Sequence, residues 1–245
     1  MSDWEKQHIV QAFRFELGKV GTPHVRARTV EQLAQVDGEL ASQVARGIGV
    51  PEPSDGREPA SKQSSPALSL EALPGDGSIR TRRIAMPAAD GVDGRQVTSV
   101  RQVLEPEGAI VEVLAAADGT VPTADGEPCA VDRALPTVAS VLYDAVVVPG
   151  TSAGASPLTA DPDAMRFVRD AYRHGKPVAA LGNGVDVLSA LEPEGLRLST
   201  EPHHMVADQG VITDVAPDIA GTDFAHALVA AIAAHRHWGR PPARR

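Results

Sequence analysis

The chain has 245 residues, of which 42% are hydrophobic and only 3% aromatic, so we expect a globular protein with an aliphatic core. Its net charge of −9 argues against a nucleic-acid-binding surface, because such surfaces need clustered basic residues and these occur only in the tail from Arg240 to Arg245. A single cysteine, Cys129, excludes an internal disulfide and a cysteine-based zinc site.

Neither targeting nor membrane insertion is indicated. The first ten residues are charged and lack the apolar centre of a signal peptide. No run of about 18 apolar residues occurs, so no segment is expected to span a membrane. These observations predict a cytoplasmic protein that contacts neither membrane nor nucleic acid.

Residues 1–50 are predicted to be helical. Apolar residues at fourfold spacing form one stripe, Ile9, Phe13 and Leu17, and Gly18 is placed to end that helix. A second stripe consists of Leu33, Val36, Leu40 and Val44. Neither helix can bury its stripe alone, so we expect residues 5–45 to pack on a partner surface.

Residues 51–78 are rich in Pro, Ser, Gly and charge, which predicts an extended or disordered linker. Residues 79–238 then alternate short apolar runs with helical patterns, and residues 239–245 form a basic tail. The apolar runs are 84–89, 109–115, 145–148 and 177–181, and the helices lie near 93–105, 161–174 and 222–235. Such alternation predicts a parallel sheet covered on both faces, with residues 119–133 as an inserted loop or small ribbon.

The stretch from Ala145 to Leu191 is the most informative. It is predicted as strand, Gly/Ser loop, helix, strand and helix, and this order resembles the PfpI-like, glutamine-amidotransferase-like superfamily of flavodoxin-like folds. In that family the second strand ends in a nucleophile elbow, in which Cys is followed by His and Gly. The matching positions here are Gly182, Asn183 and Gly184, and the family's acidic partner matches Asp93.

The resemblance therefore implies a doubly wound α/β fold with a vestigial elbow and no catalytic residue, because an acid without a nucleophile cannot carry out acyl transfer. We expect Gly182 to have a positive φ and Asn183 to cap the following helix. Asp93 is expected within several ångströms of this turn.

The sequence offers three further candidate sites. Carboxylates beside Cys129 should raise its thiol pKa, which favours an unreactive cysteine. The loop from Gly150 to Ser156 lies beyond a strand end, where backbone N–H groups can bind an anion. Ser152 or Ser156 acting with Asp93 would need an adjacent base, and the sequence places no histidine nearby.

The histidines and tyrosines are expected to have structural roles. His203 and His204 would point to opposite faces of a strand, and His235 and His237 lie at a helix end, so no metal site is expected. Tyr172 shares an apolar helix face with Met165 and Val168, and Tyr143 lies beside a strand, which predicts core packing.

The two ends of the chain carry a second resemblance. EKQHIVQAFRFELGKV (Glu5 to Val20), RARTVEQLAQVDGELASQVARGIGV and SPALSL resemble the segment that follows the haem barrel of large-subunit catalases. In those enzymes a Pro-rich linker then leads to a PfpI-like C-terminal domain. The segment HRHWGR (His235 to Arg240) resembles the end of that domain.

This resemblance implies a non-catalytic C-terminal region of a catalase that supports subunit stability and oligomer assembly. The haem and the hydrogen peroxide chemistry would belong to the full-length parent, and this chain would carry no cofactor. Its partner would be the catalase core or another copy, contacted through residues 5–45. The alternative is a stand-alone PfpI-like binding or chaperone-type module active in oxidative stress.

Overall fold

The computed structural model describes residues 2–59, 65–69, 72, 75–153, 156–216 and 223–241. It separates into two compact units, Met1–Pro74 and Gly75–Arg245. The described residues contain no helix that is both long enough and apolar enough to cross a membrane.

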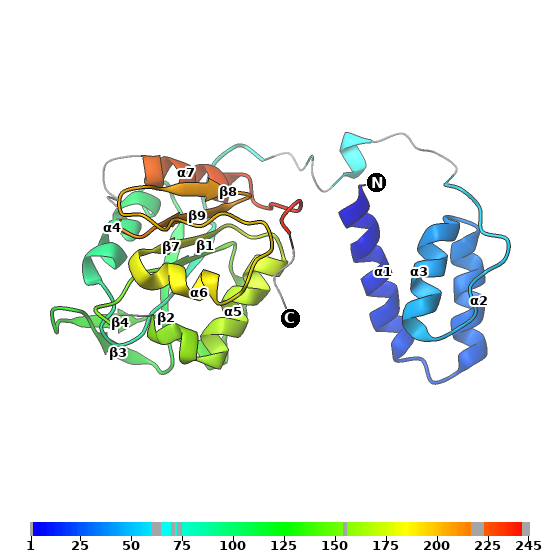
Figure 1. Ribbon diagram of the computed structural model, residues 1–245, viewed down its shortest axis with the longest axis horizontal. Coiled ribbons are helices and arrows are strands. Elements are labelled where there is room, and N and C mark those ends of the chain that lie inside the picture. The colour runs from blue at the N-terminus through cyan, green and yellow to red at the C-terminus, as the bar shows by residue number, and fades with distance from the viewer. Residues whose placement is uncertain are drawn as a thin grey trace. The chain divides into compact units, whose positions relative to one another are not determined.

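The first unit contains three helices, α1 (Asp3–Gly18), α2 (Pro23–Ala34) and α3 (Gly38–Ile48). Figure 1 shows α3 between the other two. The prediction that the second stripe lies on a single helix is wrong, because residues 35–37 separate α2 from α3. Val36 is 67% exposed there, and Asp37 caps α3. α1 ends at Gly18, as predicted.

This helical unit has a core of its own. Its buried residues include Val10, Val30 and Val44, whereas Ile9 of the predicted first stripe is 36% exposed. The three helices thus bury one another's apolar faces. The stripes alone therefore do not require an outside partner, and the contact of residues 5–45 with a catalase core or another copy stays a prediction.

The start of the predicted linker also packs on this unit. Arg57 donates its N–H to the carbonyl of Ala34 and accepts from the N–H of Gly38, at 2.8 and 2.7 Å. Gly38 and Gly56 touch so closely that a Cβ on Gly38 would lie 2.7 Å from the Gly56 Cα. Residues 51–59, predicted to belong to an extended or disordered linker, thus pack on the helical unit without regular secondary structure. The only helical turn described in the remainder is η1 (Pro66–Leu68).

The second unit is built on a seven-stranded sheet. Its strands are β1 (Arg83–Pro87), β2 (Ile110–Ala115), β5 (Arg133–Ala134), β6 (Ala145–Val148), β7 (Val178–Leu181), β8 (Val206–Asp208) and β9 (Val211–Asp214). Their order is β5-β2-β1-β6-β7-β9-β8, and every pairing is parallel except β8 with β9. This confirms the predicted doubly wound, flavodoxin-like sheet. The predicted small ribbon is β3 (Gly119–Pro122) paired with β4 (Pro128–Val131).

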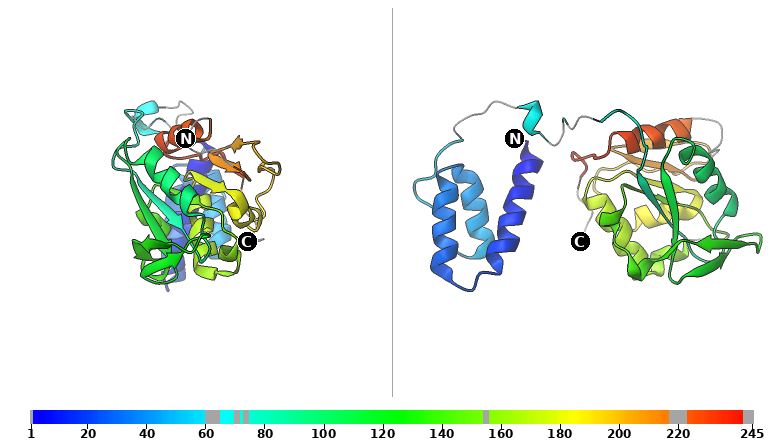
Figure 2. Two further views of the ribbon diagram at one scale, coloured as in Figure 1. Left: turned by 90° about the vertical axis from the view of Figure 1, so that its left-hand side faces the viewer. Right: turned by 180° about the vertical axis from the view of Figure 1, so that it is seen from behind.

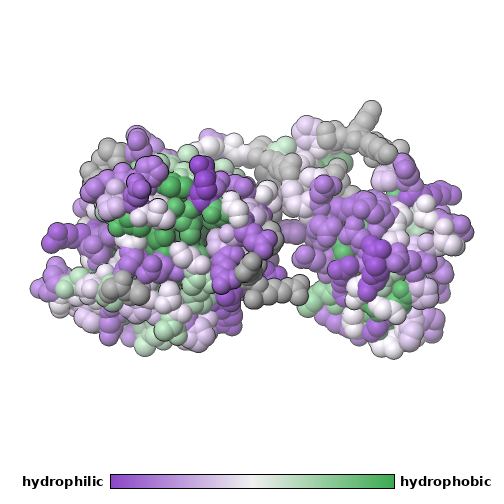
Figure 3. Space-filling view, in the orientation of Figure 1, coloured by the Kyte–Doolittle hydropathy of each residue, from purple (hydrophilic) through white to green (hydrophobic). Residues whose placement is uncertain are grey.

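Helices cover both faces of this sheet (Figures 1 and 2). α4 (Gly94–Leu104) and α7 (Asp223–Ala233) pack on one face, and α5 (Pro162–Arg173) and α6 (Val185–Ser189) on the other. Because α6 has only five residues, half-buried Leu196 and Leu198 from the segment after it also pack on this second core. Figure 3 shows apolar side chains over β8 and β9.

The chain ends in a C-terminal strap, defined here as His235–Pro241. The N–H of His237 donates to the carbonyl of Gly175 at 2.7 Å, and the Arg240 guanidinium lies 4.7 Å from the ring centre of Tyr172. Tyr172 in turn donates its hydroxyl to the carbonyl of Pro241 at 2.8 Å. Arg240, predicted to lie in a basic tail, is therefore packed against the domain, and the rest of that tail, residues 242–245, lies outside the described residues.

Candidate functional site

The site that the sequence singled out lies at the carboxyl ends of β1, β6 and β7. The strand order reverses between β1 and β6, which is where doubly wound sheets bind ligands. β7 ends at Leu181, a 3₁₀ turn follows (η5, Gly182–Gly184), and α6 begins at Val185. Gly182 has a φ of +56°, as predicted.

Glycine is needed twice in this elbow, for different reasons. At Gly182 the positive φ is the constraint, since a Cβ there would meet nothing closer than 3.4 Å. At Gly184 the space is the constraint, since a Cβ would lie 2.5 Å from the carbonyl oxygen of Val148. The turn thus combines a positive φ at its first position with a close approach to β6 at its third.

Asp93 has a structural role. Its carboxylate accepts from the N–H groups of Arg95 and Gln96, at 2.9 and 3.2 Å, and so caps α4. Its own N–H donates to the carbonyl of Gly150 at 2.8 Å. The predicted acid therefore lies in the loop next to the elbow, with its carboxylate engaged by the start of a helix.

The side chain that reaches the elbow is Gln96, which the sequence analysis missed. Its Oε1 accepts from the N–H of Gly150 at 2.7 Å, and its Nε2 lies 3.4 Å from where a Gly182 Cβ would be. The available signal was its position, three residues after the Asp93 cap and therefore on the first turn of α4. A glutamine there shows neither apolar periodicity nor a catalytic motif.

Asn183 does not cap α6, so that prediction is wrong. Its Oδ1 accepts from the N–H of Thr151 at 2.7 Å, and its Nδ2 donates to the carbonyl of Ala153 at 2.6 Å. The reason is that α6 follows a 3₁₀ turn that contains Asn183, and an amide carries both a donor and an acceptor. Asn183 therefore fastens the Gly/Ser loop to the elbow.

The Gly/Ser loop offers few free amides to an anion. The N–H groups of Gly150, Thr151, Ser152 and Ser156 are already bonded, to Gln96, Asn183, the carbonyl of Gly91 and Asp186 respectively. Gly154 and Ala155 lie outside the described residues. These four bonded amides thus do not support the predicted anion site.

The candidate serines lack a base among the described residues. Ser156 is buried, and neither its hydroxyl nor that of Ser152 is hydrogen-bonded to a histidine in that part of the chain. Cys129 is half-buried in β4, and burial, assisted by Asp132 and opposed by Arg101, raises the pKa of its thiol. Neither residue type is activated as a nucleophile.

The remaining candidates are four histidines. Burial lowers the pKa of both His235 and His237 in the strap, and the His237 Nε2 lies 3.1 Å from the carbonyl of Ala231 in α7. His203, at φ +57°, and His204 lie in the loop before β8. The described residues contain no group of three His, Cys, Asp or Glu side chains that could hold a metal ion.

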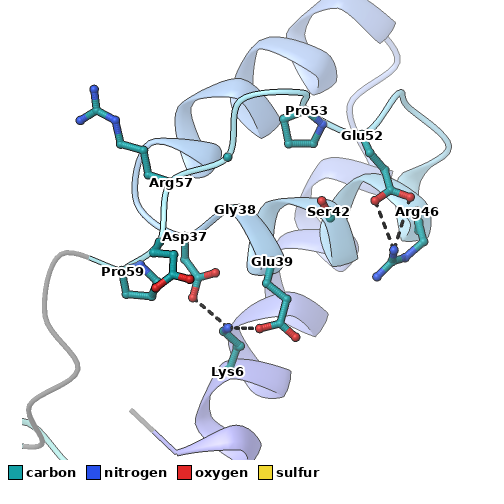
Figure 4. Close-up of a pocket in the computed structure, with 12 residues that line it drawn as sticks. Lys6, Asp37, Gly38, Glu39, Ser42, Arg46, Glu52, Pro53, Arg57 and Pro59 are labelled. Carbon is teal, nitrogen blue, oxygen red and sulfur yellow. Dashed lines mark hydrogen bonds and ion pairs between the residues drawn. The ribbon is translucent and has the colours of Figure 1, made fainter.

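A hollow of about 610 Å³ lies in the helical unit, between α1, the start of α3 and residues 52–59 (Figure 4). Lys6 Nζ lies 2.6 Å from Glu39 and 2.9 Å from Asp37, and Figure 4 shows Arg57 pointing away from this group. Burial would raise the pKa of Asp37, but the N–H of Leu40 and Lys6 outweigh it and lower that pKa. These charges satisfy one another, so the hollow shows no group prepared for a ligand.

Comparison with known proteins assigns most of the chain. Residues 80–242 match a family model described as the C-terminal domain found in long catalases, and residues 1–48 match one described as catalase-related immune-responsive. The chain is 46% identical over 242 residues to "Catalase HPII" of Mycobacterium avium and 36% identical over 244 residues to "Catalase-2" of Bacillus subtilis (strain 168). Each alignment covers 98% of this chain but only 34% and 32% of the relative, so the chain spans about a third of their length.

Proposed function

Because the chain belongs to the family of C-terminal domains found in long catalases, we propose that it does no chemistry itself and supports the stability and subunit assembly of such an enzyme. The peroxide chemistry and the haem are assigned to the part of the long catalases that this chain does not match.

The residues around the elbow support the part of this proposal that the chain does no chemistry. Gly182 stands where the resembled superfamily has its nucleophile, and Gln96 and Asn183 bond the surrounding loops to one another. A reacting site needs an activated group with room for a substrate beside it. Here the side chains beside the turn, Gln96 and Asn183, bond to the backbone of the Gly/Ser loop instead.

The two tyrosines of the chain also do not fit a haem. A tyrosine that ligates iron must lose its proton, but burial raises the pKa of both Tyr143 and Tyr172. Tyr143 donates its hydroxyl to Glu112 at 2.7 Å, and Tyr172 donates to the Pro241 carbonyl. Neither phenol is prepared as an iron ligand.

A chimera tests the assembly role. The matching third of the Mycobacterium avium relative is replaced by this chain, and a second form lacks that third altogether. We expect the chimera to keep the relative's oligomeric state and the half-life of its peroxide-decomposing activity at elevated temperature. The shortened form should lose its oligomeric state and have a shorter half-life of activity. Equal oligomeric state and equal half-life for the two forms would refute the role.

A further inference from the structure

The C-terminal strap, His235–Pro241, fits closely against the turns that precede β7 and β9. Gly175 lies in the first of these turns and Gly210 in the second, and both have a positive φ. A Cβ on Gly210 would overlap the ring of His237, and a Cβ on Gly175 would lie 3.2 Å from the His237 carbonyl oxygen. His237 is therefore the residue through which the strap contacts both turns at close range.

The hydrogen bonds of His237 also help to hold the strap. Its N–H donates to the carbonyl of Gly175 at 2.7 Å, and its Nε2 lies 3.1 Å from the carbonyl oxygen of Ala231 in α7. Because a carbonyl only accepts, this second bond places the proton of the neutral ring on Nε2. Burial lowers the pKa of the ring and outweighs the rise that the Ala231 carbonyl produces. The packed strap therefore favours a neutral imidazole.

A positive charge on this ring would have no carboxylate paired with it. Arg240 is the charged neighbour that acts on the ring, and its guanidinium lies 4.7 Å from the ring centre of Tyr172. Among the described residues, neither His237 nor Arg240 forms an ion pair with a carboxylate. Asp208, just before the turn to β9, pairs with Arg197 at 3.6 Å instead. The other titratable groups close in sequence to the residues that contact His237 are His235 and Arg236 in the strap, and Tyr172, Arg173, His174 and Lys176 at or just after the end of α5.

We propose that the strap is an acid-sensitive latch. When His237 takes a second proton, the strap leaves the turns before β7 and β9, while the sheet and its helices stay folded. A second cation beside Arg240 is costly while it is buried, and water solvates it once the strap detaches. The opening is local, because the strap lies outside the sheet and its detachment breaks few bonds. It uncovers Tyr172, which is 2% exposed and contacts the strap through both its ring and its hydroxyl.

His235 is not expected to drive this opening. Its Nε2 lies 3.5 Å from Asp144, which would offset a positive charge on the ring, although Arg82 lies 3.3 Å from the same carboxylate oxygen. The two strap histidines thus differ in one respect, since a carboxylate lies beside His235 and none of the described carboxylates pairs with His237. This difference makes His235 the matched control. The latch goes beyond the proposed function and does not depend on it.

The fluorescence of Trp238 tests the latch. Trp238 adjoins His237 in the strap and is half-buried, and Trp4→Phe leaves it as the single tryptophan of the full chain. Quenching by acrylamide is measured from about pH 7.5 to about pH 5, with circular dichroism at each pH as a check on the fold. The quenching constant should rise by about twofold or more as the pH falls below 6.5, the ordinary pKa that the detached histidine regains, while the dichroism stays constant.

Two variants identify the group that titrates. His237→Gln should abolish the rise in quenching, because glutamine can still donate to the Ala231 carbonyl but does not ionise. His235→Gln should keep the rise. A rise that survives in His237→Gln overturns the latch, and so does a quenching constant that does not change with pH in the parent. Loss of dichroism together with the rise would mean global unfolding and would overturn it as well.

Tyr172→Phe gives a second readout that leaves both histidines in place. It removes the hydroxyl that donates to the Pro241 carbonyl at 2.8 Å, so the strap is held less firmly. The rise in quenching should then occur at a higher pH than in the parent, because less protonation is needed to open a weaker latch. A midpoint equal to that of the parent would show that the strap does not open as a unit, which overturns the latch.

Discussion

At the scale of single residues, the elbow separates what a sequence can predict from what it cannot. The positive φ of Gly182 followed from the resemblance to a nucleophile elbow at the end of a buried strand, because glycine adopts that conformation without strain. The role of Asn183 did not follow, because its partners Thr151 and Ala153 come from a loop about 30 residues away. A short polar side chain is compatible with many partners, and only the tertiary fold selects among them.

Restoring a side chain at the elbow should cost stability. We expect Gly182→Cys to lower the free energy of unfolding by about 1–3 kcal/mol, because a non-glycine residue is strained at this φ. Gly182→Asn should cost less, since asparagine tolerates the left-handed region. Urea unfolding of the three proteins checks this order, and equal stability for all three would show that the turn is not strained.

Removing the Gln96 carboxamide should also destabilise the domain. Gln96→Met keeps the length of the side chain but leaves the buried Gly150 N–H without an acceptor, a loss of about 1–3 kcal/mol. Thr98→Ala, on an exposed position of the same helix, serves as the matched control. Chemical unfolding that gave the same midpoint for both variants would contradict the role assigned to Gln96.

At the scale of elements, continuous apolar runs were the most reliable signal. They located β1, β2, β6 and β7, which are largely buried. They missed β8, and also β9, which is short although it is buried throughout. The break between α2 and α3 was missed because Val36 continues the apolar spacing although it is 67% exposed. The periodicity of a sequence shows which residues are apolar, whereas their burial depends on which other elements pack against them.

The C-terminal strap gives an element-scale prediction. His235 and His237 have pKa values lowered by burial from the ordinary 6.5, so the unfolded chain binds protons that the folded strap does not. The contribution of these two histidines to the free energy of unfolding should therefore be fully present above about pH 7. It should decrease as the pH falls below 6.5.

Replacing both strap histidines tests this directly. The difference in unfolding free energy between about pH 7.5 and about pH 5.5 should shrink in a protein with His235→Gln and His237→Gln, because most carboxylates titrate below that range. An unchanged difference would mean that other groups cause the acid sensitivity.

At the scale of the whole molecule, the division into two units invites proteolysis. Leu68 is 87% exposed in η1, near the end of the first unit, so thermolysin should cleave beside it. We expect a resistant product that contains residues 75–241, because its strands and strap are hydrogen-bonded throughout. Mass spectrometry of early digests checks this, and first cuts within β6 or β7 would contradict it.

The chain should not bind haem or decompose peroxide. Hemin added to the purified protein should give no Soret band in proportion to protein, because both tyrosine hydroxyls are engaged and buried. A stoichiometric band with turnover would refute this prediction and the proposed function together.

The placement of α7 has a consequence for synthesis on the ribosome. Phe224, Leu228 and Ile232 cover a sheet face that also includes Ile84, from the first strand. About 50 residues separate the end of β7 from Ile232, which corresponds to roughly 3–10 seconds of translation. During that interval the nascent sheet lacks α7, so its apolar face is open to chaperones and to misassembly until α7 has been made.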